Sequence, residues 1–281
     1  MNTENSTPKV AIVTGASAGI GKATAKSLLK AGYTVYCGAR RVAEMKDLEQ
    51  LGAKIGHLDL VEQSSIDKFV GDILAAQSSI DVLVNNAGYG SYGAVEDVAM
   101  EEARRQFEVN LFGLAAMTNA VLPTMRGQRS GKVIHIGSTG GKLWSILGGW
   151  YQASKFALEG LSDCTRNELK PFGIDVILIE PGAVTSEWVG IAQDHLIKTS
   201  GSGPYKAIAD SAVKFYAGVE DMGVDAQIIA DVIMKALRAK KPKARYVAPS
   251  TMKPLLFLRR ILSDSLFDKL WNKMQGVPKS V

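Results

Sequence analysis

The chain has 281 residues, 46% apolar and 22% charged, with a formal net charge of +5, which are ordinary values for a globular domain with a full core. Its two cysteines, Cys37 and Cys164, exclude a disulfide framework, and no apolar run is long enough to cross a membrane. The polar N-terminus lacks the apolar core of a signal peptide, so we expect a soluble, cytoplasmic protein.

Strand and helix patterns alternate along most of the chain. Short apolar runs rich in β-branched residues predict strands over 9–14, 34–38, 54–58, 80–84, 132–136, 175–179 and 244–248. The stretches between them predict helices over 20–31, 43–51, 64–77, 100–125, 150–171 and 225–239. This alternation indicates right-handed crossovers, and therefore an open parallel α/β sheet with helices on both faces.

The regular order fails over residues 184–223. This stretch contains Gly201-Ser202-Gly203-Pro204 and is too long for an ordinary connection. We expect it to form a mobile, partly helical lid over the substrate. Because the chain shows no repeat and no interdomain linker, we predict one domain over residues 1–249, with residues 250–281 as its extension.

A glycine-rich turn, Thr14-Gly15-Ala16-Ser17-Ala18-Gly19-Ile20-Gly21, joins the first predicted strand to the first predicted helix. Glycines allow a tight turn, and they let backbone N–H groups approach a diphosphate at the positive end of the helix. The spacing is Gly-x-x-x-Gly-x-Gly. The residues predicted to bind a dinucleotide here are Gly15, Ser17, Gly19, Ile20 and Gly21.

The second predicted strand ends in Arg40 and Arg41, with no acidic residue at its tip. A dinucleotide fold reads the adenosine ribose at this position, where an acid accepts from the 2′-hydroxyl and an arginine accommodates a 2′-phosphate. We therefore predict NADP(H) in preference to NAD(H). Asp59, just after the third strand, is placed to accept from the adenine amino group.

Tyr151 and Lys155 are four residues apart and share one helical face, with Ser138 upstream at the end of the fifth predicted strand. A phenol titrates near pH 10, and an ammonium beside it favours the phenolate. The pair therefore predicts proton transfer to or from a substrate oxygen. Ser138 lies at the carboxyl end of its strand, where ligands bind in open α/β sheets.

Together these residues resemble the short-chain dehydrogenase/reductase family, of the classical type, over roughly residues 10–248. The motifs that carry the resemblance, in order, are Thr14–Gly21, Asn85-Asn86-Ala87-Gly88, Asn110, Ser138, Tyr151 with Lys155, and Pro181-Gly182. The ending Gly38-Ala39-Arg40 is similar to NADP-preferring members that act on hydroxysteroids, retinoids and other ketones. The resemblance implies a Rossmann-type, doubly wound sheet of seven strands.

The resemblance also implies roles for the catalytic residues. Tyr151 would be the general acid or base, and Lys155 would hold the nicotinamide ribose and lower the pKa of Tyr151. Ser138 would bond the substrate oxygen, and Asn110 would open its helix to hold a water that relays protons to Lys155. The remaining cofactor contacts would come from Asn86, Ala87, Gly88, Pro181, Gly182, Val184 and Ser186.

Aromatic and apolar residues are concentrated in loops near the predicted site. Those predicted to line an apolar, ring-accepting substrate pocket are Tyr89, Tyr92, Trp144, Leu147, Trp150 and Trp188. The alternative is that these side chains simply anchor their loops. The three histidines have no metal-ligand spacing, so we predict no metal site.

Positive charge is concentrated near the C-terminus. Residues 234–281 carry twelve Lys or Arg and two Asp, whereas residues 1–233 carry 21 basic and 26 acidic side chains. Within residues 250–281, apolar side chains recur at helical spacing beside Lys and Arg. Three interpretations stay open: packing on the substrate cleft or a partner subunit, contact with an anionic membrane, or a frayed tail. No basic motif with interleaved aromatics indicates nucleic acid.

The sequence as a whole predicts an NADP(H)-dependent oxidoreductase that interconverts an alcohol and its carbonyl. By analogy with the family, we expect a homodimer or homotetramer formed through the helices over 100–125 and 150–171. Two alternatives remain: a non-catalytic NADP(H)-binding sensor, and a sugar-nucleotide epimerase or dehydratase, which also uses tyrosine with lysine.

Overall fold

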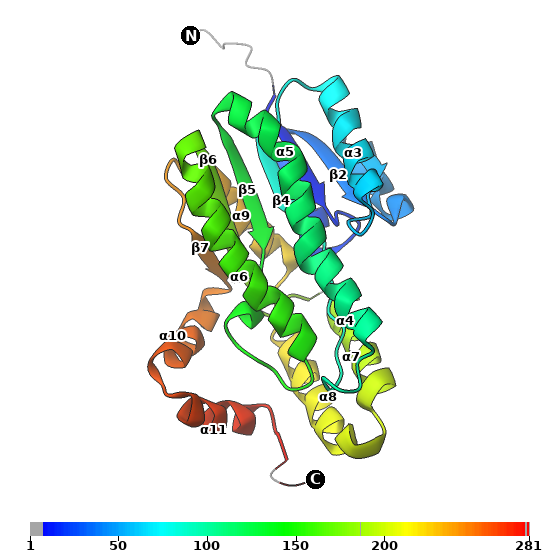
Figure 1. Ribbon diagram of the computed structural model, residues 1–281, viewed down its shortest axis with the longest axis vertical. Coiled ribbons are helices and arrows are strands. Elements are labelled where there is room, and N and C mark those ends of the chain that lie inside the picture. Colours follow the sequence, from blue (N-terminus) through cyan, green and yellow to red (C-terminus); the bar gives the residue numbers. More distant parts are fainter. Residues whose placement is uncertain (1–7, 186, 279, 281) are drawn as a thin grey trace.

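The computed structural model describes residues 8–185, 187–278 and 280, and it contains a seven-stranded, wholly parallel sheet with the strand order β3-β2-β1-β4-β5-β6-β7 (Figure 1). The strands are β1 Val10–Thr14, β2 Thr34–Ala39, β3 Lys54–His57, β4 Val82–Asn85, β5 Gly131–Ile136, β6 Ile174–Pro181 and β7 Arg245–Ala248. The order reverses direction between β1 and β4, as in a doubly wound sheet. The α/β prediction is confirmed.

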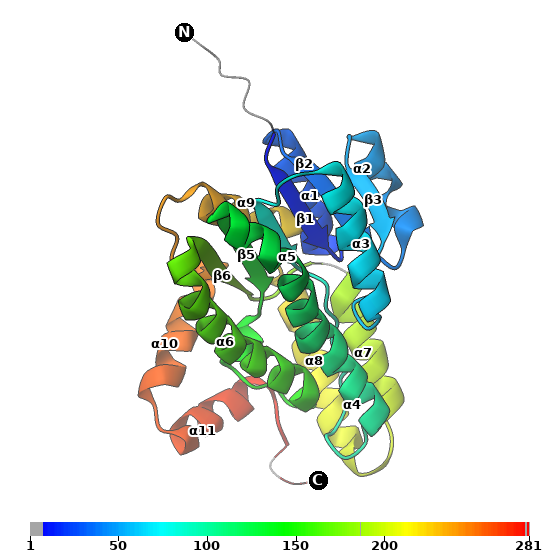
Figure 2. The ribbon, with the colours of Figure 1, turned by 45° about the horizontal axis from the view of Figure 1, so that its top comes forward.

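Helices cover both faces of the sheet. One face carries α3 Gln63–Ala76, α5 Leu114–Gln128 and α6 Gly149–Leu169, and the other carries α1 Gly19–Lys30 and α9 Ala226–Arg238 (Figures 1 and 2). The side chains of β1 alternate between the two cores: Ala11 and Val13 pack on the α1 side, whereas Val10 and Ile12 pack on the α3 side. Burial on both faces explains why this strand is apolar throughout.

The predicted helix over 100–125 is interrupted. It consists of α4 Met100–Phe107, a π-helical turn Glu108–Gly113 and α5, whereas the predicted helix over 43–51 is a 3-10 turn followed by the short α2 Lys46–Gln50. A π-turn inserts one residue into the helical ladder and is common at functional sites. Here it contains the buried Asn110, so the helix is opened where the family resemblance implies.

The predicted lid is more helical than the sequence suggests. It forms α7 Glu187–Ser200 and α8 Lys206–Asp221, which lie beyond the carboxyl ends of the strands (Figure 1). Its two ends are joined by a parallel bridge between Val184 and Val224. The Ser200 hydroxyl accepts from the Ala94 N–H at 2.9 Å and donates to Asp97 at 2.6 Å. The lid therefore leaves the sheet and returns at one point, and it is anchored to the loop after β4.

The C-terminal extension forms two helices, α10 Lys253–Ile261 and α11 Asp264–Met274, which lie to one side of the lid (Figures 1 and 2). Phe267 and Trp271 of α11 are buried against Leu143 and against Phe215 of α8. One face of the extension therefore packs on the chain's own substrate side. Within the described residues, no helix is both long and apolar enough to span a bilayer.

Candidate active site

The glycine turn presents an open helix end. Gly15 and Gly19 have φ angles of 64° and 51°, which other residues rarely adopt. Helix α1 has no side-chain cap and no acidic residue in its first turn. Among the described residues, no acceptor takes the backbone N–H groups from Ser17 to Gly21. Free N–H groups at a positive helix end suit the diphosphate of a dinucleotide.

Thr14 and Asn86 lock this turn in place. The Asn86 amide donates to the carbonyls of Thr14 and Gly15, both at 3.0 Å. The buried Thr14 hydroxyl accepts from the N–H groups of Asn86 at 3.0 Å and Ala87 at 3.1 Å. The side chain of Asn86, predicted as a cofactor contact, therefore also ties β4 to the turn after β1. Thr14 belongs to the same motif but was not predicted as a site residue.

Two arginines occupy the end of β2. Arg40 and Arg41 directly follow the strand, and both are exposed. Asp59 follows β3, where its carboxylate accepts from the Val61 N–H at 3.1 Å. No acidic residue stands at the tip of β2, so its end is cationic, as the sequence predicts.

Tyr151, Lys155 and Ser138 meet at the carboxyl end of β5. Tyr151 and Lys155 lie in the first turns of α6, and both are buried. The Lys155 Nζ atom donates to the carbonyl of Ile136 at 2.9 Å and lies 5.9 Å from the centre of the Tyr151 ring. The Ser138 hydroxyl accepts from the Gly140 N–H at 2.9 Å and is hydrogen-bonded with Tyr151. The three predicted residues are therefore brought together.

Burial controls the proton affinities of this pair. Desolvation raises the pKa of Tyr151 to about 12, and the hydrogen bond with Ser138 only partly opposes that rise. Desolvation also lowers the pKa of Lys155 to about 8. The protein alone therefore holds the phenol in its acid form, whereas the sequence-based expectation was a tyrosine pKa lowered by the lysine. A protonated phenol is the form that can donate a proton.

Asn110 connects the π-turn to the loop after β4 and to α6. Its side-chain oxygen accepts from the Tyr89 N–H at 3.0 Å, and its Nδ2 donates to the Tyr89 carbonyl at 2.9 Å. Nδ2 also lies 3.1 Å from the Ser154 hydroxyl. A Cβ atom on Gly88 would come within 3.1 Å of Asn110 and 3.8 Å of the Lys155 Nζ atom. Asn110 and Gly88 therefore border the Lys155 amine.

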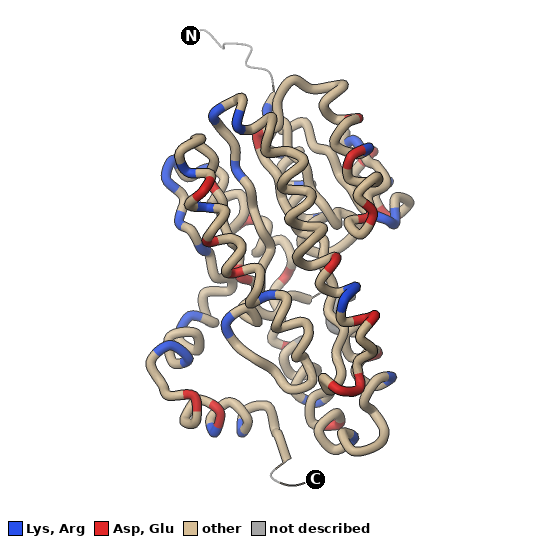
Figure 3. The backbone as a smooth tube through the Cα atoms, viewed as in Figure 1, with Lys and Arg blue, Asp and Glu red and all other residues tan. Residues whose placement is uncertain are grey.

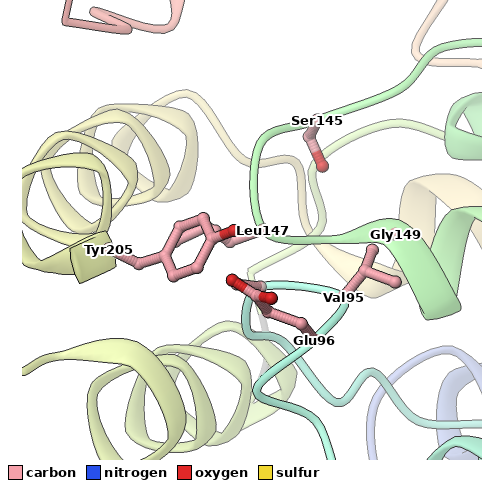
Figure 4. A pocket seen from close by; sticks show the side chains of 7 residues that line it. Val95, Glu96, Ser145, Leu147, Gly149 and Tyr205 are labelled. Carbon is pink, nitrogen blue, oxygen red and sulfur yellow. The ribbon is translucent and has the colours of Figure 1, made fainter. Parts of the chain in front are cut away.

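Only some of the residues predicted to line the substrate pocket do so in the structure. Leu147 lines a pocket of about 460 Å³ together with Ala94, Val95, Glu96, Ser145, Gly149 and Tyr205 (Figure 4). Trp150 instead packs edge-to-face on Phe107, and Trp144 belongs to the cluster beneath α11. None of the four predicted catalytic side chains lines this pocket. The pocket is bordered instead by the loop after β4, by the segment that leads into α6 and by Tyr205, which lies between α7 and α8.

Five further residues were predicted to contact the substrate or the cofactor: Tyr89, Trp188, Ser186, Val184 and Gly182. Tyr89 is half-buried beside the π-turn and does not line the pocket. The side chain of Trp188 and all of Ser186 lie outside the described residues. Val184 and Gly182 lie where β6 enters the lid, and the Gly182 N–H donates to the carbonyl of Ala248 at 2.8 Å.

An apolar cluster covers Tyr151 from the lid side. The Tyr151 ring lies 5.7 Å from the ring of Tyr92, as measured between centroids. Both rings pack against Ala192 and Leu196 of α7 and Ala212 of α8. Ile146 and Leu147 pack against this cluster. Tyr151 is therefore covered by apolar side chains on the lid side.

The segment 143–147, which we call the substrate loop, is held by residues that the sequence did not reveal. The Ile146 N–H donates to Gln275 at 2.9 Å, and the indole N–H of Trp271 donates to the Trp144 carbonyl at 2.5 Å. Leu147 has a φ of 58°, and its carbonyl accepts from the Gly93 N–H at 2.7 Å. A left-handed leucine persists only where its surroundings enforce it.

Tyr216 of α8 links the lid to the same loop through hydrogen bonds. Its hydroxyl donates to Ser145 at 2.8 Å and lies 3.3 Å from the Ile146 carbonyl. Its ring stands edge-to-face on Tyr92, with centroids 5.1 Å apart. The Ser145 hydroxyl also accepts from the side chain of Gln152, at 2.5 Å. Loop, lid and α6 thus form one hydrogen-bonded unit around Tyr151.

Comparison with known proteins gives consistent results. A model of the short chain dehydrogenase family matches residues 9–195. The chain is 35% identical to an NADPH-dependent 3-dehydrocapnine reductase of Ornithobacterium rhinotracheale, over 94% of this chain and 96% of the relative. It is 36% identical to a 3-ketodihydrosphingosine reductase of Bacteroides thetaiotaomicron, over 85% of this chain and 87% of the relative.

The solved structures include a similar protein of the same length. A short-chain dehydrogenase from Streptomyces avermitilis superimposes with a TM-score of 0.80 and is 33% identical, and the match covers 99% of this chain and 100% of that one. The similarity therefore extends beyond the nucleotide-binding half to the lid and the C-terminal helices.

Proposed function

Because the chain belongs to the short-chain dehydrogenase/reductase family of oxidoreductases, which act on alcohols and ketones with a nicotinamide cofactor, we propose that it uses NADPH to reduce the ketone of a long-chain lipid. The observation that carries this proposal is the buried Tyr151 hydroxyl, hydrogen-bonded with Ser138 and covered by an apolar cluster. The site thus combines a proton donor with an apolar cover.

The proposed reaction reduces a carbonyl to a secondary alcohol. Bound NADPH would supply a hydride to the carbonyl carbon. Tyr151 would donate its phenolic proton to the carbonyl oxygen, and Ser138 would hold that oxygen beside it. The raised pKa of Tyr151, about 12, keeps the proton on the phenol at neutral pH, so the proton that reduction requires is present.

Lys155 and Asn110 would serve the proton-transfer residue. Lys155 would hold the nicotinamide ribose with its amine, which the Ile136 carbonyl already orients. Asn110, in the π-turn, would position the loop at Tyr89 and a water that returns protons toward Lys155. These roles follow the family pattern, and the burial of both side chains supports them.

The choice of NADPH rests on the end of β2. Arg40 is exposed there and would pair with the 2′-phosphate, with Arg41 beside it and Asp59 directed to the adenine. One relative is named as NADPH-dependent. The uncapped N-terminus of α1 would receive the diphosphate.

The substrate class rests on the apolar surfaces and on the relatives. The names of two relatives specify 3-dehydrocapnine and 3-ketodihydrosphingosine, and both denote a ketone at carbon 3. The cluster of Tyr92, Leu196 and Ile146 would accommodate carbons next to such a ketone.

Oxidation of NADPH with 3-ketodihydrosphingosine in detergent micelles tests the proposal. We expect turnover with this ketone, and a loss of at least about 1,000-fold in Tyr151→Phe with NADPH affinity unchanged. Retained turnover in Tyr151→Phe would contradict the assignment of the proton donor. NADPH binding without turnover on any ketone would instead indicate a sensor, and tight retention of cofactor with a sugar nucleotide would indicate an epimerase.

We also infer a homo-oligomer that forms through α4, α5 and α6. Phe112 and Phe156 lie on this helical face and are exposed, at 54% and 46% of their surface. Exposed aromatic side chains on adjacent helices suit an interface between copies. Light scattering should report a dimer or tetramer, and Phe112→Ser with Phe156→Ser should shift it toward a monomer.

A further inference from the structure

We propose that α10 and α11 dock on an anionic lipid bilayer through one exposed face. Five large apolar side chains form this docking face, each 37–60% exposed: Phe257, Ile261, Leu266, Leu270 and Met274. In each helix they recur four residues apart, so they form a stripe. Phe267 and Trp271 are buried in the core instead, so the stripe is separate from the face that packs on the chain.

The fold leaves this stripe uncovered. The two helices extend from the body on the side opposite α4 and α7, and the views in Figures 1 and 2 agree on this placement. Isolated exposed apolar side chains are common in proteins, but five at helical spacing on consecutive helices indicate a contact surface.

Cations surround the stripe. Lys253, Arg260, Lys269 and Lys273 are exposed, and none of the four forms an ion pair with another described residue. Figure 3 shows Lys and Arg positions along both helices, together with acidic positions in α11. The fifth cation of the two helices, Arg259, pairs with Asp264 at 2.8 Å. Amphipathic helices of this composition lie in the interface of a membrane, with apolar side chains among the acyl chains and Lys or Arg at the headgroups.

Charge favours a bilayer over a second copy of the chain. In a two-fold contact the same patch meets itself, so unpaired cations from both copies would approach one another. An anionic bilayer supplies both an apolar interior and negative headgroups. We therefore assign this face to the lipid surface.

The same two helices also hold the substrate loop. Trp271 and Gln275 bond the backbone at Trp144 and Ile146, so the face that holds the substrate loop is next to the docking face around α11 and distinct from it. If the proposed lipid ketone is the substrate, docking would bring the loop close to the bilayer that contains it. This last step rests on the proposed function, whereas the docking itself does not.

Flotation with vesicles tests the docking without any turnover. Full-length protein with NADPH is mixed with vesicles of phosphatidylcholine, or of phosphatidylcholine with 30% phosphatidylglycerol. We expect binding to the anionic vesicles only, weakened by raised salt. Phe257→Ser with Leu270→Ser, and separately Lys269→Glu with Lys273→Glu, should each lower the partition coefficient at least about tenfold.

Matched variants elsewhere on the surface serve as controls. Leu51→Ser with Leu74→Ser removes two exposed apolar side chains, and Lys30→Glu with Lys235→Glu reverses two exposed charges, all outside α10 and α11. Both control variants should bind the anionic vesicles as strongly as the unchanged protein does. Equal binding by the docking-face variants would overturn the proposal, as would a dimer in light scattering that these variants dissociate. Thermal melting verifies that each variant is folded.

Discussion

The nucleotide side and the substrate side of the active site, which share the carboxyl edge of the sheet, are held together by different kinds of contact. On the nucleotide side, the turn after β1 is locked by Thr14, the last residue of β1, and by Asn86, which directly follows the adjacent strand β4. On the substrate side, the loop at Ile146 is held by Gln275, 129 positions away in the chain. The first half is specified by short motifs, and the second by tertiary contacts between distant segments.

This difference has a functional consequence. A motif whose glycines and caps act locally fixes the cofactor in the same way whatever the substrate. The lid, the substrate loop and α11 instead form a unit whose parts can change without disturbing the turn. Substitutions on the nucleotide side should therefore alter cofactor affinity, and substitutions on the substrate side should alter the KM for the ketone.

Among the variants that address cofactor binding, Gly21→Ala should have the largest effect. A Cβ atom there would collide with the Gly15 carbonyl and the Asn86 amide, both of which belong to the locked turn. Overpacking of this kind costs roughly 3 kcal/mol, so we expect about 100-fold weaker NADPH binding by calorimetric titration.

Gly71→Ala is the matched control for that experiment. Gly71 lies inside α3 with no atom within 4 Å of its added Cβ. It should bind NADPH normally and gain up to about 1 kcal/mol in stability. Normal binding by Gly21→Ala would show that the turn is not the diphosphate site.

Arg40→Asp should have the next largest effect. Removing the cation and adding an acid at the end of β2 should reverse the preference from NADPH toward NADH, by about 50-fold in the ratio of kcat/KM values. Arg40→Ala separates the loss of the cation from the gain of the acid, because it should lower kcat/KM with NADPH without raising kcat/KM with NADH. An unchanged preference in both variants would refute the phosphate assignment.

The sequence predicted the nucleotide half well because its signals are local. Each of the seven predicted strands overlaps an observed one, and the glycine turn lies between β1 and α1 as expected. The π-turn at Asn110 could be anticipated only through the family resemblance, since composition does not distinguish it from an ordinary helical turn.

The substrate half could not be predicted to the same depth. Trp144 was expected in the pocket wall because it lies between Ser138 and Tyr151 in sequence. Its environment is set instead by Trp271, 127 positions later. No periodicity in either segment encodes that pairing, and the same holds for Gln275. The raised pKa of Tyr151 likewise depends on burial by the lid, which the sequence left as a mobile segment.

Lys155 lies between the two halves. Burial of its ammonium group should lower the free energy of unfolding, and this effect can be measured. Its folded pKa of about 8 is below its ordinary value of 10.5. The unfolded chain therefore binds more protons between these values, and the free energy of unfolding should rise as pH increases from about 8 to 10.5. Lys155→Met should remove this slope and stabilise the protein at pH 7 by about 2 kcal/mol, while abolishing turnover.

Urea denaturation at several pH values measures this effect. Lys46→Met, which removes an exposed lysine, is the control and should leave the slope unchanged. A Lys155→Met protein that is less stable than the unchanged chain at pH 7 would show that the buried ammonium is stabilised by its surroundings. In that case the desolvation argument fails.

Gln275→Leu should have the smallest effect and should separate the two halves most cleanly. The change keeps the volume of a nearly fully buried side chain but leaves the Ile146 N–H without its acceptor. The substrate loop should then relax from the left-handed conformation at Leu147. We expect the KM for the ketone to rise about tenfold, with kcat within about twofold and NADPH affinity unchanged. Met274→Leu, on the exposed face of the same helix, should have no effect on KM.

A second substitution tests whether the loop conformation is the cause. Glycine adopts a φ of 58° without strain, so Leu147→Gly should make the loop conformation less dependent on the hydrogen bond to Gln275. In a Leu147→Gly background, Gln275→Leu should therefore raise KM by clearly less than tenfold. If the effects of the two substitutions on KM simply multiply, Gln275 does not act through the conformation of this loop. A parallel loss of NADPH affinity would mean that the nucleotide and substrate halves are coupled after all.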